Sequence, residues 1–175
     1  NDFSFQFWIN PAASNTANNI FVADIKDVAT VRISPISNNY YLSIQCYNTS
    51  NSIVSTSSTN LQIEPNRFSH LAVTRRDNML KLYLVNDKDL SNIRIDSVTI
   101  SNARKNFTPT ANNCFVIMGN AFKGYIDETR IWNKALSSAT ILQDYNRMLI
   151  GNEEGLKAYW TFDEGLPGQF FDISK

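Results

Sequence analysis

Acidic residues that stand side by side are the first feature of this sequence that could do chemistry. Asp127-Glu128 and Asp163-Glu164 each fall in or next to a run of strand-like residues. Hydrolysis of a glycosidic bond needs two carboxyl groups that flank the bond, one ionised and one protonated. Because consecutive residues of a strand point to opposite faces, neither pair is expected to act in this way. We interpret these carboxylates as surface charge and as a structural partner for Arg130.

Other residue types that carry catalysis are scarce. His70 is the single histidine, so any Ser-His-Asp or Cys-His site would have to be built around it. It stands at the start of a strand-like run, where we expect a hydrogen-bonded structural role. No Cys or His spacing typical of zinc sites and no phosphate-binding loop is present in the sequence. The sequence therefore predicts no catalytic residues, and we expect that the protein is not an enzyme.

A strand with a polar and aromatic face is the best candidate for binding. In residues 40–47, apolar side chains alternate with Tyr41, Ser43, Gln45 and Tyr47. Alternation with a period of two places these four residues on the face away from the core. Aromatic rings can cover the apolar face of a sugar, and amides can bond its hydroxyl groups. Tyr41, Gln45 and Tyr47 are the predicted ligand-binding residues, and the expected ligand is a glycan.

Length, charge and hydropathy limit the number of domains and the kinds of partner that the protein can have. The chain has 175 residues and 43% hydrophobic content, enough for one domain with a core of its own. Basic and acidic residues both number 16, so the formal net charge is zero and no nucleic-acid partner is expected. No apolar run approaches the roughly 20 residues that span a bilayer, so membrane insertion is not expected either.

The two cysteines leave two alternatives. Cys46 and Cys114 each stand in a strand-like run, far apart in the sequence. A disulfide would need their Cα atoms within about 7 Å, and the sequence does not show that distance. Two buried free thiols are the favoured alternative.

Alternating and helical patterns indicate the elements that hold these residues. Residues 3–9 have a wholly apolar face with a period of two, which should lie between two sheets. Residues 67–86 predict a hairpin that turns at 76–78. Ser137 is a suitable helix N-cap, and Gly151 ends the run that it begins. Many short strands and one helix favour an antiparallel sandwich. The apolar face of the predicted helix consists of Ile141, Tyr145, Met148 and Leu149.

Three segments of the chain resemble a known family. They are Phe-Ser-Phe-Gln-Phe-Trp-Ile-Asn-Pro at 3–11, the strand-like run at 122–136, and Gly-Leu-Lys-Ala-Tyr-Trp-Thr-Phe-Asp-Glu-Gly at 155–165. Together they are similar to the laminin-G-like and pentraxin-like domains of the concanavalin A-type lectin and glucanase superfamily. The resemblance implies an all-β fold, a two-sheet antiparallel jelly-roll sandwich with one short C-terminal α-helix. This fold hosts sugar-binding, protein-binding and purely structural members.

The resemblance also implies where calcium could bind. Pentraxins take calcium ligands from an acidic loop before the strand that corresponds to 124–133, but residues 119–123 contain no carboxylate here. A pentraxin-type double site is therefore not expected. In related glucanases, an Asp at the position that resembles Asp127 binds one ion together with backbone carbonyls. Asp127 is thus the predicted ligand of one structural calcium ion, and the alternative is that it bonds backbone amides of a neighbouring loop.

The order of these segments bears on the domain boundary. In the family, the motif at 155–165 usually begins a domain, whereas here it follows the predicted helix. We assign residues 1–150 to one laminin-G-like jelly-roll domain, and 151–175 to a connector plus a strand at about 156–163. That strand either closes the same sandwich or begins a following repeat. Closure is favoured, because an unpaired edge strand rich in aromatic residues would promote aggregation.

These expectations together define a class of function. We expect a non-catalytic binding or adhesion module of a larger extracellular or cell-surface protein that recognises a glycan. A protein–protein interaction or structural spacer domain is the alternative, and an accessory domain of a glycoside hydrolase is a more distant one. The partners would then be a glycan or protein ligand and the neighbouring domains of the parent chain.

Overall fold

The computed structural model of the protein describes most of the chain. The described residues are 2–16, 20–25, 29–47, 53–86, 89–99, 116–118, 121–165 and 169–175. Cys114 lies outside the described residues. Cys46 belongs to a described strand, but its side chain is not described, so both alternatives for the two cysteines stay predictions. No helix in the described part of the chain has the length and the apolar character needed to cross a bilayer.

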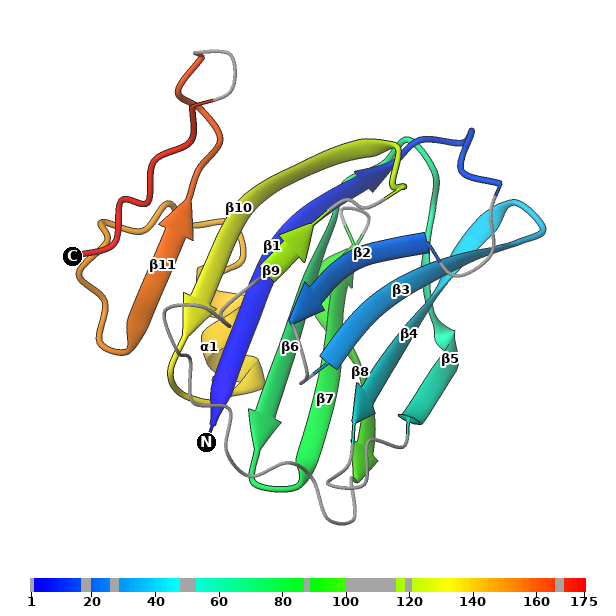
Figure 1. Ribbon diagram of the computed structural model, residues 1–175, viewed down its shortest axis with the longest axis horizontal. Coiled ribbons are helices and arrows are strands. Elements are labelled where there is room, and N and C mark those ends of the chain that lie inside the picture. The colour runs from blue at the N-terminus through cyan, green and yellow to red at the C-terminus, as the bar shows by residue number, and fades with distance from the viewer. Residues whose placement is uncertain are drawn as a thin grey trace.

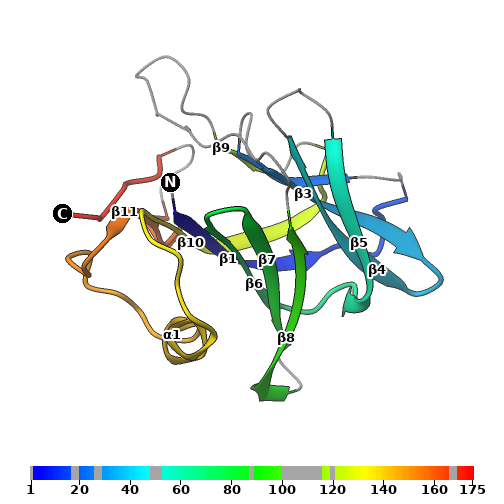
Figure 2. The same cartoon turned by 90° about the horizontal axis from the view of Figure 1, so that it is seen from below.

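The described strands form two antiparallel sheets that face each other (Figures 1 and 2). The arrangement confirms the predicted all-β, two-sheet jelly-roll sandwich with one short helix near the C-terminus. The six-stranded sheet has the order β11-β10-β1-β6-β7-β8, with β11 (Leu156–Trp160), β10 (Gly124–Trp132), β1 (Phe3–Pro11), β6 (Ser69–Arg76), β7 (Met79–Asn86) and β8 (Asp89–Thr99). The five-stranded sheet has the order β5-β4-β3-β2-β9, with β5 (Ile53–Ile63), β4 (Asn39–Tyr47), β3 (Ala29–Ile36), β2 (Ile20–Ile25) and β9 (Val116–Met118).

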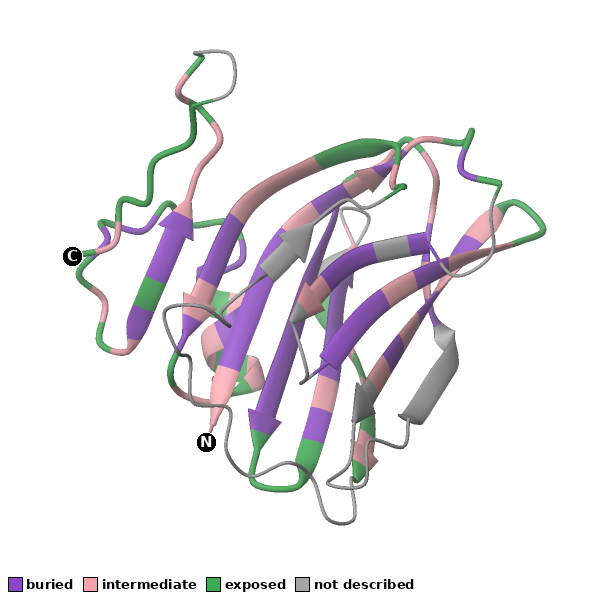
Figure 3. Ribbon diagram, in the orientation of Figure 1, coloured by how far each residue is buried: buried purple, intermediate pink, exposed green. Residues whose placement is uncertain are grey.

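The main apolar core fills the space between the two sheets. Phe5, Phe7 and Ile9 of β1 are at most 1% exposed, and Figure 3 shows the nearly continuous burial of β1 and β6. The three side chains belong to one cluster with inward residues of β3, β4, β6 and β7. The period-two face predicted for residues 3–9 is therefore confirmed, because alternate side chains of a strand share one face.

A second buried layer covers the outer face of the six-stranded sheet. The helix α1 (Ser138–Asp144) and the segments that flank it lie on this face (Figure 2). Ile141 of α1 packs in one cluster with Tyr83 of β7 and Trp132 of β10. Since both faces of β1 are covered, its polar residues Ser4 and Gln6 are fully buried as well.

The helix begins as predicted and ends earlier. Ser137 is the N-cap, and its hydroxyl accepts the backbone N–H of the third residue after it at 3.1 Å. α1 ends at Asp144, because the chain turns there with a bond of 3.2 Å from the Arg147 N–H to the Asp144 carbonyl. Met148 was predicted on the apolar face, and this was wrong: it is 68% exposed. The other predicted residues of that face are buried, namely Ile141, Tyr145 and Leu149.

A bulge in β10 breaks the alternation that was expected at Asp127 and Glu128. Gln6 pairs with Arg130 but Trp8 pairs with Asp127, so one residue of β1 stands opposite two residues of β10. Glu128 takes up the irregularity with a φ of 50°. The two carboxylates therefore both turn to the outer side of the sheet, and the prediction that they point to opposite faces was wrong. Arg130 was predicted to have a structural partner among the carboxylates, and Glu128 is that partner, with an ion pair of 2.6 Å.

The displaced family motif forms the edge strand β11. It pairs with β10 in antiparallel register, with Tyr159 opposite Arg130 and Ala158 opposite Ile131. The strand ends at Trp160, three residues before the predicted end at 163. The C-terminal segment 169–175 runs along its outer side, where the Ile173 N–H donates to the Tyr159 carbonyl at 2.9 Å. The edge is thus partly covered, and the division into domains at residue 150 stays a prediction.

Candidate functional site

The predicted glycan face lies on the outer side of the five-stranded sheet. Tyr41 and Gln45 of β4 are both half-buried, and they stand opposite Ser34 and Thr30 of β3. Tyr47 ends the same strand, but its side chain is outside the described part of the structure. The fold thus brings Tyr41 and Gln45 to one polar sheet face. That they bind a ligand stays a prediction.

The predicted metal ligand Asp127 lies in β10, opposite Trp8. Its carboxylate accepts the backbone N–H of Glu128 at 2.9 Å. Partial burial raises the pKa of Asp127, and the negative charges of Glu128 and Asp163 act in the same direction, against the lowering effect of that hydrogen bond. The described residues contain no group of three or more His, Cys, Asp or Glu side chains that could hold a metal ion. A calcium ion at Asp127 would therefore depend on backbone carbonyls and water for most of its six to eight oxygens.

The most densely bonded polar cluster lies under the helix and is closed to solvent. Arg130 is 1% exposed and donates at 2.6 Å to the Glu128 carboxylate and to the carbonyls of Asp144 and Arg147. The Tyr159 hydroxyl donates to the same carboxylate at 2.5 Å, and burial, followed by this bond, raises the pKa of Tyr159 to about 12. Two donors thus hold the Glu128 carboxylate, and the cluster fixes the helix on the sheet.

His70 belongs to the same buried layer. Its ring lies between those of Trp8 and Tyr145, with ring centroids 5.4 Å and 6.2 Å away. Burial lowers the pKa of His70 to about 3, and the positive charge of Arg130 adds to this effect. The histidine is neutral at physiological pH and is a packed strand residue, as predicted. The expectation that it is fully hydrogen-bonded was wrong, because its Nδ1 atom has no partner among the described residues.

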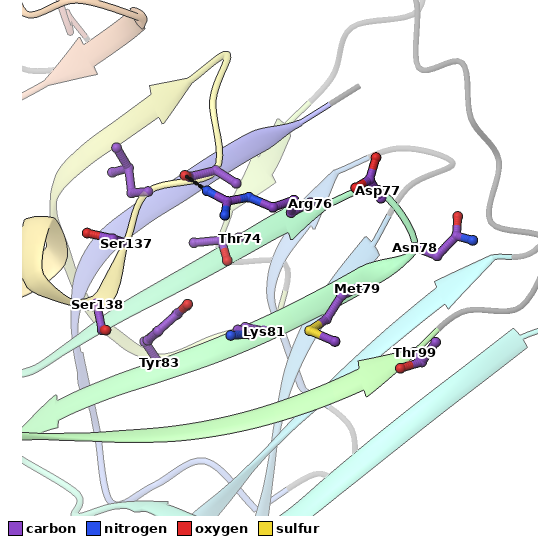
Figure 4. A pocket seen from close by; sticks show the side chains of 12 residues that line it. Thr74, Arg76, Asp77, Asn78, Met79, Lys81, Tyr83, Thr99, Ser137 and Ser138 are labelled. Atoms are coloured by element: carbon purple, nitrogen blue, oxygen red, sulfur yellow. Dashed lines mark hydrogen bonds between the residues drawn. The ribbon is translucent and has the colours of Figure 1, made fainter.

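A solvent-accessible hollow opens on the same outer face, beside the helix (Figure 4). Its volume is about 590 Å³, within the range of about 300–1,000 Å³ that is usual for small-molecule sites. The β6–β7 hairpin forms one side and the segment 135–138 forms the other. The lining residues are Thr74, Arg76, Asp77, Asn78, Met79, Lys81, Tyr83, Thr99, Ala135, Leu136, Ser137 and Ser138.

Strand register explains why the hairpin presents polar groups to this hollow. Thr74 pairs with Lys81 and Arg76 pairs with Met79, so all four side chains share the outer face of the sheet. The turn Asp77-Asn78 is tight, with Asp77 at a φ of 52°, a conformation that Asp tolerates better than most residues.

Two bonds hold the opposite side of the hollow in place. The Ser4 hydroxyl donates to the Lys134 carbonyl at 2.7 Å and accepts the Leu136 N–H at 2.8 Å. The Arg76 guanidinium reaches across and donates to the Ala135 carbonyl at 3.2 Å, as the dashed line in Figure 4 shows. The hollow is therefore built by elements that tertiary bonds fix relative to each other.

The chemistry of the lining suits binding. Arg76 and Lys81 supply positive charge, and the hydroxyl groups of the lining can donate and accept hydrogen bonds. Among the described residues of the lining, Asp77 is the single carboxylate.

Reasoning from the sequence alone did not identify this site. Alternation along the hairpin 67–86 places Thr74, Arg76 and Lys81 on one face, so the sequence does indicate that these polar side chains lie together. The approach of residues 135–138, which turns this face into a hollow, has no signal in the sequence.

Comparison with known proteins agrees with the fold. A laminin G family model of the concanavalin A-like lectin/glucanases superfamily matches residues 1–142. Among curated proteins, none matches the sequence significantly.

Solved structures share the architecture at low sequence identity. A candidate carbohydrate-binding protein from Bacteroides ovatus ATCC 8483 is 18% identical with a TM-score of 0.70, over 98% of this chain and 49% of that chain. The binding domain of Paraclostridial Mosquitocidal Protein 1 is 19% identical with a TM-score of 0.57, over 83% of this chain and 37% of that chain. Domain 4 of AbnA, a GH43 extracellular arabinanase from Geobacillus stearothermophilus solved in complex with arabinotriose, is 20% identical with a TM-score of 0.50, over 82% and 66%. The chain thus spans about half of the first of these proteins, and the likeness is one of fold.

Proposed function

The chain belongs to the concanavalin A-like lectin and glucanase superfamily, and from this premise we propose that it is a non-catalytic carbohydrate-binding module of a larger extracellular or cell-surface protein. The observation that carries the proposal is the hollow of about 590 Å³ between the β6–β7 hairpin and residues 135–138. Structures of the same fold include a candidate carbohydrate-binding protein and an arabinanase domain bound to arabinotriose, and both support the proposal.

The lining of the hollow matches the two kinds of surface that a sugar presents. Met79 is 41% exposed and offers apolar surface for the C–H face of a sugar ring, and the buried residues Tyr83 and Leu136 also line the hollow. The hydroxyl groups of Thr99 and Ser138 stand nearby and can bond sugar hydroxyls. Sites for small molecules commonly combine a mostly apolar wall with a few polar groups that fix orientation.

The module binds a glycan without cleaving it. The acidic pair in β10 is unsuited to catalysis, because Glu128 is tied to Arg130 and Tyr159. The described lining of the hollow contains one carboxylate, that of Asp77, which lies at the hairpin turn, whereas a glycosidase needs a pair.

The polar face of β4 is a second glycan surface in this proposal. Tyr41 and Gln45 lie together there, and Tyr47 follows in the same strand. One calcium ion at Asp127 is the cofactor that we propose, with a purely structural effect.

Protein–protein interaction is the second candidate function, and exposed apolar side chains favour it. Met148 and Ile150 are 68% and 67% exposed, and Phe170 and Phe171 are 59% and 53% exposed. Apolar side chains exposed close together often mark a contact surface for another protein. Under this alternative the module would be an interaction or spacer domain.

A glycan array with the wild-type protein and two variants tests the proposal. Thr99→Trp places a bulky ring at the exposed rim of the hollow, and Tyr41→Ala removes the aromatic ring of the other face. We expect glycan binding by the wild type and its loss in Thr99→Trp. Lys157→Trp, at an exposed position of β11, is the matched control and should keep binding. No glycan signal from the wild type at high protein concentration would instead favour the protein-binding function.

A further inference from the structure

We infer that the hollow recognises an anionic sugar, whose carboxylate or sulfate group is bound by Lys81 and Arg76. The inference rests on the proposed carbohydrate-binding function and names the class of ligand for that site. The proposed function by itself leaves open whether the glycan is neutral or acidic. The formal net charge of the whole chain is zero and gives no preference for either.

Lys81 is a cation without an anionic neighbour among the described residues on its face of the sheet. Its cross-strand neighbours are Thr74 in β6 and Ser97 in β8, both uncharged. No described carboxylate forms an ion pair with it within 4.0 Å. Its side chain is half-buried in the lining of the hollow, between Met79 and Tyr83 in Figure 4. The ammonium group is therefore available for a ligand.

Arg76 is a second cation whose position is fixed. One terminal nitrogen of its guanidinium, Nη2, donates to the Ala135 carbonyl, which directs the side chain along the hollow toward residues 135–138. A guanidinium has five N–H donors, so the others remain for a ligand. Because a neutral carbonyl and not a carboxylate holds Arg76, its positive charge is not cancelled.

The described negative charge lies at the hairpin end of the hollow. Among the described lining residues, Asp77 alone carries a carboxylate; it directly follows Arg76 in the hairpin turn, at the far end of the hollow from Ser137 and Ser138. The Asp2 carboxylate accepts the Asp77 N–H at 3.1 Å and so lies at the same end, whereas the Arg76 guanidinium points away from it, toward the Ala135 carbonyl. Asp96 is close in sequence to Ser97, but it pairs with Leu82 and so belongs to the opposite face of β8 from Ser97. The described lining therefore holds two cations and one carboxylate, which leaves a net positive charge.

A net positive charge in the described lining of a half-enclosed hollow favours an anion over a neutral ligand. Hydrogen bonds in which both groups are charged are roughly twice as strong as neutral ones, and the arginine fork matches the flat geometry of a carboxylate. Complementary charge also selects against ligands of the wrong sign. A carboxylate and a sulfate present the same oxygen acceptors, so the geometry predicts an acidic sugar and leaves the acid group to experiment.

Calorimetric titration with matched pairs of sugars tests the inference. The carboxylate pair is digalacturonate against digalactose, and the sulfate pair is lactose 6′-sulfate against lactose. We expect the acidic member of at least one pair to bind about tenfold more tightly than its neutral counterpart, in keeping with the strength of charged hydrogen bonds. The preference should fall when NaCl is raised from 50 to 300 mM, because salt screens exposed charges. Whichever pair shows it identifies the acid group.

Two variants locate the site. Lys81→Met keeps the length of the side chain, and we expect it to weaken binding of the acidic sugar about tenfold and leave the neutral sugar unchanged. Arg76→Gln should act in the same direction, and Lys157→Met, an exposed lysine on β11, should have no effect. Thermal melting of each variant verifies that it folds.

The outcomes separate this inference from the proposed function. Binding of neutral and acidic sugars with equal affinity would overturn the inference and leave the carbohydrate-binding function intact. Binding of acidic sugar that both folded variants retain would overturn the placement at Lys81 and Arg76. Binding of no sugar, in these pairs and on a glycan array, would overturn the proposed function itself.

Discussion

Arg130 joins three segments of the chain through one guanidinium group. It bonds Glu128 in its own strand, the carbonyl of Asp144 at the end of α1, and the carbonyl of Arg147 in the turn that follows. Arg130→Met keeps much of the volume but leaves the Glu128 carboxylate without its cation. We expect the variant to lower the free energy of unfolding by roughly 3–5 kcal/mol, the usual cost of breaking a buried ion pair. Urea denaturation measures this loss.

The control for Arg130 is its neighbour in the same cluster. Arg147 also forms an ion pair, with Asp144, but its side chain is 51% exposed. Arg147→Met should therefore cost less than about 1 kcal/mol. Equal losses in the two variants would show that Arg130 does not hold the helix on the sheet.

His70 should make stability depend on pH. Its pKa is lowered from 6.5 to about 3 in the folded protein, first by burial and then by Arg130. Because the unfolded chain binds the proton more readily, the stability that neutral His70 provides is fully present above pH 6.5 and declines as the pH falls toward about 3. We expect His70→Phe to lose less unfolding free energy than the wild type between pH 6.5 and pH 4 in urea denaturation. Parallel pH profiles would refute this assignment.

Asp127 provides the test for calcium. An ion that binds the folded protein alone must raise the melting temperature by mass action. We expect calcium to raise the midpoint relative to a chelator in the wild type and to have no effect on Asp127→Asn. An unchanged wild-type midpoint would remove calcium from the proposal. The partner that Asp127 does show is the backbone N–H of Glu128, so the variant itself should fold.

At the scale of elements, the short helix depends on its cap more than on its length. α1 has seven residues, too few for stability without caps and tertiary packing. Ser137 accepts the Thr140 N–H and also contacts its hydroxyl at 2.9 Å. We expect Ser137→Ala to cost about 1 kcal/mol in unfolding free energy. Ser138→Ala, the next residue, is the matched control and should be nearly neutral; a larger effect there would contradict the assignment of the cap.

At the scale of the whole molecule, the two candidate binding faces lie on opposite sides of the sandwich. The hollow belongs to the outer face of the six-stranded sheet, and Tyr41 belongs to the outer face of the five-stranded sheet. Distant sites without shared partners act additively. We expect Tyr41→Ala to leave binding of an acidic sugar by Lys81 unchanged in calorimetry. A loss in Tyr41→Ala that equals the loss in Lys81→Met would indicate one site instead of two.

Some elements were predictable because local pattern and tertiary role agree. The apolar residues of 3–9 recur with a period of two, and a strand that alternates in this way can bury only one such face. Ser137 caps the helix through a bond to a backbone group three residues away, which the local sequence also encodes. Arg130 was expected to have a carboxylate partner, and it bonds Glu128, which lies two residues away in the same strand.

Two features differ from what the sequence pattern predicts, because residues distant in the sequence form bonds there. The left-handed conformation of Glu128 turns its carboxylate toward Arg130 and Tyr159, which changes the face that strict alternation assigns. The early end of α1 coincides with the bonds from Arg130 to the carbonyls of Asp144 and Arg147. Periodicity contains no information about either contact.

The sequence by itself determined the superfamily, the two-sheet architecture and the inward faces of the strands, because these follow from alternation and short-range caps. Tertiary structure alone decided the candidate site. The hollow exists because the bonds of Ser4 with Lys134 and Leu136 bring the segment 135–138 to the β6–β7 hairpin. A bond between residues more than 100 positions apart depends on how the whole chain packs, and no local pattern reports it.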